Sequence, residues 1–258
     1  MNTIEKYYNK FNEDKRLNTK HGIVEFTISM EHIIKHIKNN PSKIIDIGAG
    51  TGKYAIALSN EGHDVTAIDL VKKNISVLKQ KSKNVKAYQC SALNLSKFGD
   101  KTFDIVILFG PLYHLFDEHE KLKALLEAKR ILKDDGVMFV AYILSDYAFI
   151  RHAIMDNFLR QNINEGKIDK NYNILTSEED LYSYIKLPEI KALNKKAGLK
   201  RKYIFSPDGP TDYIRNSINN LNEEDFLTYI DYQRKNCKRK DLLGASSHVV
   251  DVLVKNCK

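Results

Sequence analysis

The sequence has little cysteine and no long apolar run, and both shortages narrow the possible classes of protein. Its three cysteines, Cys90, Cys237 and Cys257, are far apart and follow no pattern. This argues against a disulfide framework and a zinc site, so we expect no metal. No apolar segment reaches the roughly 20 residues that a membrane-spanning helix needs. Residues 1–8 also lack the apolar core of a secretion signal. We therefore expect a cytoplasmic protein with no membrane partner.

The chain also lacks the aromatic side chains that would make its basic clusters a typical surface for nucleic acid. The formal net charge is +8, and basic residues gather at 195–202 and at 235–240. Neither cluster contains an aromatic residue on which a base could stack. We therefore favour a solvated basic surface over a nucleic-acid site, and RNA remains an alternative partner.

What the chain does have is a regular alternation of short apolar runs and amphipathic stretches. It has 258 residues, of which 43% are hydrophobic and 29% charged, as in a soluble globular protein with a large core. Strands that alternate with helices of this length are typical of βαβ units. The sequence thus predicts an α/β fold: a doubly wound, mostly parallel seven-stranded sheet with helices on both faces. The expected strands are 44–47, 62–69, 85–89, 103–109, 137–144, 199–205 and 248–254.

A glycine-rich turn follows the first strand, at Asp46-Ile-Gly-Ala-Gly-Thr-Gly52. Glycines let backbone amides approach an anionic or polar ligand closely, because no Cβ intervenes. A dinucleotide site would place a third glycine at position 53, where this chain has Lys53, so an NAD site is disfavoured. Asp69 ends the next strand, where a carboxylate can accept hydrogen bonds from both ribose hydroxyls of an adenosine. The alternative is an ordinary acid at a strand end.

Asp46 to Gly52 resembles the first motif of the class I S-adenosylmethionine-dependent methyltransferases, and further similar pieces extend along the chain. Glu127 to Gly136 matches later motifs of the same family. A closer resemblance includes Gly110-Pro-Leu-Tyr-His-Leu115, Ser206-Pro-Asp-Gly209, and Cys237 to His248. Together they look like a bacterial subgroup whose members are mostly known as predicted enzymes. The resemblance implies S-adenosylmethionine as cofactor, S-adenosylhomocysteine as product, and cofactor binding by Asp46, Gly48, Ala49, Gly50, Gly52, Asp69, Leu70, Ser91, Ala92, Leu93 and Phe109.

Two segments depart from the pattern of that family. The adenine-contacting segment, commonly Gly-Asp-Ala or Gly-Asn-Ala, is Cys90-Ser-Ala92 here, so Ser91 must replace the usual polar residue. After the fourth strand, enzymes that methylate amino groups of bases typically have Asp/Asn-Pro-Pro-Tyr/Phe. This chain has Phe109-Gly-Pro-Leu112, which disfavours methylation of base amines.

The predicted organisation is one domain over residues 1–258 with a candidate acceptor site after the fourth strand. Its parts are a helical cap (1–40), a cofactor-binding core (41–144), an inserted lid or substrate helix (145–176) and the rest of the sheet (177–258). The acids after Ser177 predict a helix start there, with the helix continuing toward Lys196 and kinked at Pro188.

Tyr113 and His114 are the candidate catalytic residues, because an imidazole titrates near neutrality and an aromatic face can favour a sulfonium charge. His114 could instead only pack the loop. The candidate substrate-binding residues, each with a structural role as its alternative, are Tyr8, Arg16, Tyr142, Tyr147 and Arg151.

The sequence therefore predicts transfer of a methyl group to a small-molecule acceptor, at an oxygen, nitrogen or sulfur, by in-line displacement. Holding nucleophile, methyl and sulfur in line supplies much of the rate, so a strong base is not required. Two alternatives stay open: an RNA or protein methyltransferase that uses the basic surface, and a non-catalytic module that binds S-adenosylmethionine. We expect a monomer or homodimer, and the sequence does not identify the acceptor.

Overall fold

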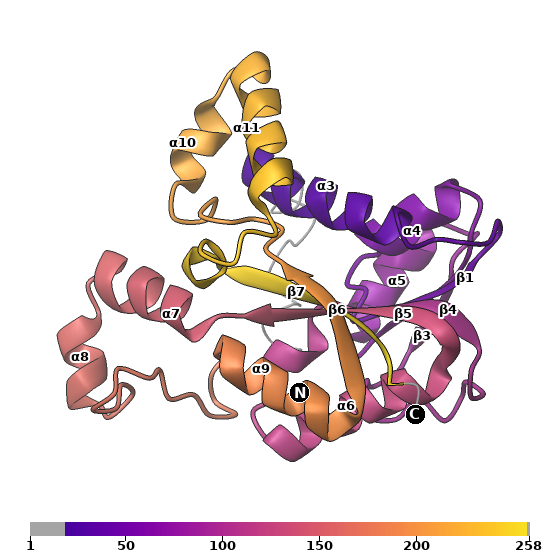
Figure 1. Ribbon diagram of the computed structural model, residues 1–258, viewed down its shortest axis with the longest axis horizontal. Helices are drawn as coiled ribbons and strands as arrows, with labels where there is room; N and C mark the ends of the chain where they lie inside the picture. The colour runs from indigo at the N-terminus through magenta and orange to yellow at the C-terminus, as the bar shows by residue number, and fades with distance from the viewer. Residues whose placement is uncertain (1–18, 257–258) are drawn as a thin grey trace.

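A seven-stranded sheet with the strand order β3-β2-β1-β4-β5-β7-β6 runs through the computed structural model, which describes residues 19–256 (Figure 1). Neighbouring strands from β3 to β5 pair in parallel, and β7 pairs antiparallel with both β5 and β6. The doubly wound, mostly parallel sheet is therefore confirmed. The strands are β1 (Lys43–Ile47), β2 (Asp64–Asp69), β3 (Lys86–Gln89), β4 (Phe103–Leu108), β5 (Leu132–Ile143), β6 (Leu199–Phe205) and β7 (His248–Lys255).

The central strands are buried on both faces, which explains their continuous apolar runs. Ile44, Ile45, Val106 and Ile107 of β1 and β4 have no exposed surface. The chain places β2 and β3 on one side of β1, then crosses to β4 and β5 on the other side. Ligands bind at such a switch point, beyond the carboxyl ends of the strands.

Helices cover both faces of the sheet, as predicted (Figure 1). Side chains of α3 (Lys20–Ile34), α4 (Lys53–Asn60) and α5 (Lys72–Lys81) share one core cluster with β1 and β2. Side chains of α6 (Glu118–Ile131) and α9 (Leu187–Ala197) share the cluster on the opposite face. A third, smaller cluster joins α3 to α10 (Arg215–Asn220) and α11 (Glu223–Asn236).

The insertion after β5 is helical only in its first part. It consists of α7 (Ser145–Ala148), the π-helical turn η2 (Phe149–Met155) and α8 (Leu159–Asn164), which lie beyond the end of β5 in Figure 1. Two short 3₁₀ turns, η1 (Pro111–His114) and η3 (Leu243–Ala245), complete the elements. None of the helices in residues 19–256 is long and apolar enough to cross a membrane.

The predicted helix from Ser177 to Lys196 is wrong over its first half. Residues 183–185 are extended instead, because the amides of Ser183 and Ile185 donate to the carbonyls of Tyr113 (2.8 Å) and Ile143 (3.1 Å). The helix α9 starts at Leu187, and Pro188 lies in its first turn and does not kink it. Proline suits that position, since its missing amide would be unpaired there anyway. The expected helix within residues 1–18 lies outside the described residues.

Candidate functional site

A cavity opens at the carboxyl ends of β1, β2 and β4, at the switch point of the sheet. Its walls are the glycine turn after β1, the end of β2, the segment after β3 and the loop after β4. Most of the predicted site residues line it: Asp46, Gly48, Ala49, Gly50, Asp69, Leu70, Ser91, Ala92, Leu93, Phe109, Tyr113 and His114. Residues from four separate segments thus face one space.

The glycine turn is held tightly between β2 and the loop after β4. The amides of Gly48 and Ala49 both donate to the Ile68 carbonyl, at 2.8 and 2.9 Å. Gly48 has a φ of 81°, and a Cβ there would lie 2.5 Å from Cδ of Pro111. Only glycine accommodates both the left-handed backbone and that close approach. Gly52, also predicted to bind cofactor, is the N-cap of α4 and packs toward Leu78, so it shapes the turn without lining the cavity.

Asp69 ties the turn to the end of β2. Its Oδ2 accepts the amide of Gly50 at 2.8 Å, and its Oδ1 accepts the amide of Val71 (2.8 Å) and the side-chain amide of Asn74 (3.2 Å). Burial raises the pKa of this carboxyl, and these three hydrogen bonds act in the opposite direction. A carboxylate offers about four acceptor positions, so Oδ2 can accept a further hydrogen bond from a ligand in the cavity.

Asp46 is the second buried acid of the cavity. The residue is 1% exposed, and Oδ2 has no hydrogen-bond partner among the described residues. Burial raises the pKa of Asp46 to about 7, with a further contribution from the nearby Asp69, while the amide of Ala55 lowers it. An orphaned buried acceptor is costly, and a donor or cation placed in the cavity would relieve that cost.

The segment after β3 contributes small side chains and one hydroxyl to the wall. Ser91 Oγ accepts the amide of Leu93 at 3.2 Å, which closes a short turn that presents Ser91 and Ala92 to the cavity. Cys90 lines the cavity as well. Burial raises the pKa of its thiol, so at neutral pH it is no nucleophile.

Tyr113 and His114 lie on η1, next to the extended segment that follows the insertion. His114 Nδ1 donates to the Leu181 carbonyl at 2.8 Å, and burial lowers the His114 pKa to about 4. The ring is therefore neutral near pH 7, with its proton on Nδ1. The Tyr113 ring contacts the Tyr182 and His248 rings, with centroids 5.8 and 6.3 Å apart. Both candidate catalytic residues thus line the cavity and are held by the segment after the insertion and by the start of β7.

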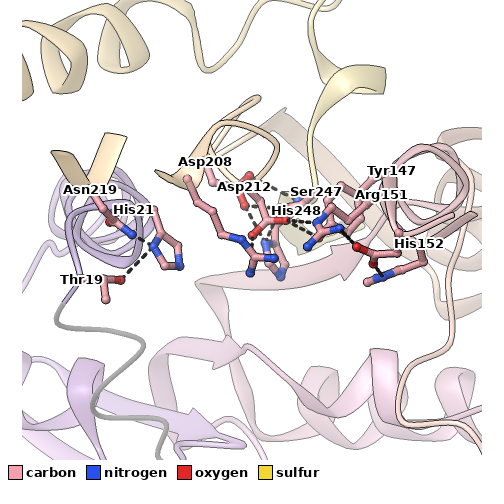
Figure 2. Close-up of polar contacts among 12 residues, drawn as sticks. Thr19, His21, Tyr147, Arg151, His152, Asp208, Asp212, Asn219, Ser247 and His248 are labelled. Atoms are coloured by element: carbon pink, nitrogen blue, oxygen red, sulfur yellow. Dashed lines mark hydrogen bonds and ion pairs between the residues drawn. The ribbon is translucent and has the colours of Figure 1, made fainter. Parts of the chain in front are cut away.

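The predicted substrate-binding residues are placed differently. Tyr142 is 2% exposed within the core and does not line the cavity. Tyr147 donates to Asp212 Oδ2 at 2.6 Å, and Arg151 pairs with Asp212, as Figure 2 shows. Arg151 also pairs with Asp156. The contacts with Asp212 tie the insertion to the loop after β6, which favours the structural alternative for Tyr147 and Arg151. Burial in the core favours it for Tyr142. Tyr8 and Arg16 lie outside the described residues.

The structure adds cavity residues that the sequence did not single out, including Glu25 and Lys53. Glu25 comes from α3, within the predicted helical cap, where the sequence singled out no residue of this helix. Lys53, considered earlier only as a missing glycine, carries its ammonium 4.7 Å from the Phe26 ring centroid. None of the lysines of the two basic clusters lines the cavity.

Known proteins match this chain in sequence and in fold. Residues 45–140 match the family described as "Methyltransferase domain". A ubiquinone biosynthesis O-methyltransferase of Pelagibacter ubique is 32% identical over 132 residues, which cover 46% of this chain and 53% of that protein. The chain spans about half the length of the curated relatives it matches.

Solved structures extend the likeness over nearly the whole chain, at the level of fold. A putative methyltransferase of Haloferax volcanii, solved with the Trm112 activator, has a TM-score of 0.64 at 15% identity and covers 100% of this chain and 99% of its own. The 1,6-didemethyltoxoflavin-N1-methyltransferase of Burkholderia thailandensis, solved with S-adenosylhomocysteine, has a TM-score of 0.59 at 17% identity, covering 97% of this chain and 84% of its own.

Proposed function

We propose that this chain, whose residues 45–140 match a methyltransferase domain, is a class I S-adenosylmethionine-dependent enzyme that methylates a small-molecule acceptor at an oxygen, nitrogen or sulfur. One observation carries the proposal. A single cavity joins the glycine turn and its two buried acids to Tyr113 and His114. A donor site and an acceptor site that share one space are what direct transfer between two bound molecules requires.

The residues of the cavity suit the chemical groups of S-adenosylmethionine. The unsatisfied Oδ2 of Asp46 suits the cationic amino-acid end, and Asp69 Oδ2 has the capacity to accept a ribose hydroxyl. Leu70, Ala92 and Leu93 would offer apolar contacts to the adenine, with Ser91 as a polar neighbour. When bound, the cofactor supplies a methyl group already activated on a sulfonium sulfur.

On the acceptor side, the chain provides orientation and exclusion of water more than strong acid–base chemistry. Because the His114 pKa is about 4, its neutral ring is a weak base that suits accepting a hydrogen bond from an acceptor hydroxyl or amine. Tyr113 would pack against the acceptor. The amide of Ser183 holds the Tyr113 carbonyl, which fixes η1 against the segment after the insertion.

A small acceptor is favoured because no lysine or arginine of the two basic clusters lines the cavity. Tyr182 lies against both Tyr113 and His114, with ring centroids at 5.8 and 5.3 Å, and so adds an aromatic neighbour beside the candidate acceptor residues.

The test is methyl transfer from radiolabelled S-adenosylmethionine to panels of small amines, phenols, carboxylic acids and thiols, with RNA and protein as separate panels. Product formation with a small acceptor supports the proposal. Label transferred only to RNA or protein would overturn the small-molecule assignment. Tight binding of S-adenosylhomocysteine without transfer to any panel would instead indicate a non-catalytic binding module.

A further inference from the structure

A cluster of three metal-ligating side chains lies beside the cavity and has no part in the cofactor site. It consists of Glu25 from α3, Asp208 from the loop after β6, and His248 from the start of β7. One ligand atom from each lies within 4.8 Å of the other two. Glu25 and Asp208 lie more than 180 positions apart in the sequence, so only the fold brings the three residues together.

From this geometry we propose that Glu25, Asp208 and His248 form a binding site for one divalent transition-metal ion at the acceptor end of the cavity. Metal bonds to oxygen and nitrogen of about 2.0–2.2 Å place neighbouring ligand atoms about 3–3.5 Å apart. The three ligand atoms lie within 4.8 Å of one another, so rotations of the side chains would bring them to one ion. Glu25 itself lines the cavity, so the ion would lie at its wall.

The site is built around Asp208, which is 5% exposed and held by neighbouring groups. The hydroxyl of Ser247 donates to its Oδ2, and the hydroxyl of Ser206 donates to its Oδ1 at 3.4 Å. His248 Nδ1 lies 2.7 Å from Oδ2, and the His248 amide donates to Oδ1 at 3.3 Å. Such outer contacts orient the ligands of known metal sites. Figure 2 shows Asp208, Ser247 and His248 gathered in this arrangement.

The donor set selects the class of ion. Two carboxylates balance the charge of a divalent cation, and one imidazole nitrogen favours Mn²⁺, Fe²⁺, Co²⁺ or Zn²⁺ over Ca²⁺ and Mg²⁺, which prefer oxygen alone. Three protein ligands leave positions for water or another ligand, as catalytic sites do.

The use of the ion rests on the proposed function. An ion at the cavity wall near Tyr113 could bind an acceptor hydroxyl or amine and lower its pKa, which would produce the nucleophile without a strong protein base. The Tyr113 and His248 ring centroids lie 6.3 Å apart, so the cluster borders the predicted acceptor side. The acceptor class that follows is a small molecule with a metal-binding oxygen or nitrogen.

The experiment uses the full chain, stripped with a chelator and titrated with Mn²⁺ alone while the electron paramagnetic resonance signal of free Mn²⁺ is recorded. We expect one ion bound per chain, and displacement by Zn²⁺, which nitrogen and oxygen ligands hold more tightly. Glu25→Gln and His248→Gln should each weaken Mn²⁺ binding at least about tenfold. Circular dichroism checks that both variants fold.

Matched controls are Glu31→Gln, on the same helix but paired with Arg234 at 2.7 Å, and His152→Gln on the insertion. Both should bind Mn²⁺ as the unchanged chain does. Absence of Mn²⁺ binding, or binding that both cluster variants retain in full, would overturn the inference. Because no cofactor is present in the titration, a chain that binds S-adenosylhomocysteine but no Mn²⁺ loses only the metal site and keeps the proposed function.

Discussion

Asp46 makes the stability of the ligand-free protein depend on pH in an unusual direction. Its pKa is raised from 3.8 to about 7 because the carboxyl is buried beside Asp69. A group whose pKa is raised in the folded protein stabilises the fold most at a pH below its pKa in the unfolded chain. This contribution is lost as the pH rises to the pKa of the group in the folded protein. For Asp46 the loss therefore develops between about pH 4 and pH 7.

The magnitude follows from the two pKa values. Each pKa unit corresponds to about 1.4 kcal/mol, so a charged Asp46 lowers the free energy of unfolding by about 4 kcal/mol at pH 8. At pH 5, where the carboxyl is protonated in the fold and mostly ionised in the unfolded chain, the same reasoning gives a loss of roughly 2 kcal/mol. Asp46→Asn keeps a carbonyl oxygen for the Ala55 amide but carries no charge. The stability of the variant relative to the unchanged protein should therefore rise by roughly 2–3 kcal/mol between pH 5 and pH 8.

The assay is urea unfolding of both proteins at pH 5 and pH 8 without cofactor. Asp104→Asn is the matched control. Burial raises the pKa of the Asp104 carboxyl, but the Lys133 ammonium and the Lys43 amide together lower this pKa by a larger amount. The net pKa shift is therefore downward. That variant should be destabilised equally at both pH values. An Asp46→Asn effect that is the same at pH 5 and pH 8 would refute a buried, titrating carboxyl. Asp46→Asn should bind S-adenosylhomocysteine more weakly although it is more stable at pH 8. The substitution removes the carboxylate that suits the amino group of the ligand.

The remaining predictions concern the turn, the ribose acid and the acceptor side. Gly48→Ala should lower the free energy of unfolding by about 1–3 kcal/mol more than Gly62→Ala does. Both glycines have a positive φ, but only at Gly48 would a Cβ meet Pro111. Equal losses of stability in urea unfolding would show that Pro111 moves aside without strain. Asp69→Ala should weaken binding of S-adenosylmethionine about tenfold or more while the chain stays folded, and calorimetry with unchanged affinity would remove its ribose role. His114→Ala should lower turnover more than cofactor affinity once an acceptor is known; an unaltered rate would return His114 to packing.

Local patterns were sufficient to predict the sheet and most of the residues that line the cavity. The glycine turn, Asp69 and the segment at Ser91 each follow a strand directly, and the carboxyl ends of parallel strands meet at one edge. Their convergence on one cavity follows from the strand pattern itself. Gly52 alone among the predicted cofactor residues turned toward α5, because its Cβ position faces Leu78.

Where tertiary contacts decided the outcome, the sequence patterns failed or were ambiguous. The acids after Ser177 are a helix-start signal, yet pairing of Ser183 and Ile185 with η1 and β5 keeps that segment extended. Tyr142 lies on a strand buried on both faces, where alternation does not tell which side chains reach a cavity. Glu25, Asp208 and His248 carry no common spacing, so no motif could have linked them.

The position of β7 has a consequence for the order in which the molecule can be completed. β6 is synthesised before β7, but in the described sheet it is joined to the remainder only through β7. During synthesis, β6 therefore cannot pair with the sheet until β7, which lies between β5 and β6, has been made. The pairing of β7 also brings His248 to Asp208. The outer half of the sheet and the cluster of Glu25, Asp208 and His248 would therefore form together, as the last step of folding.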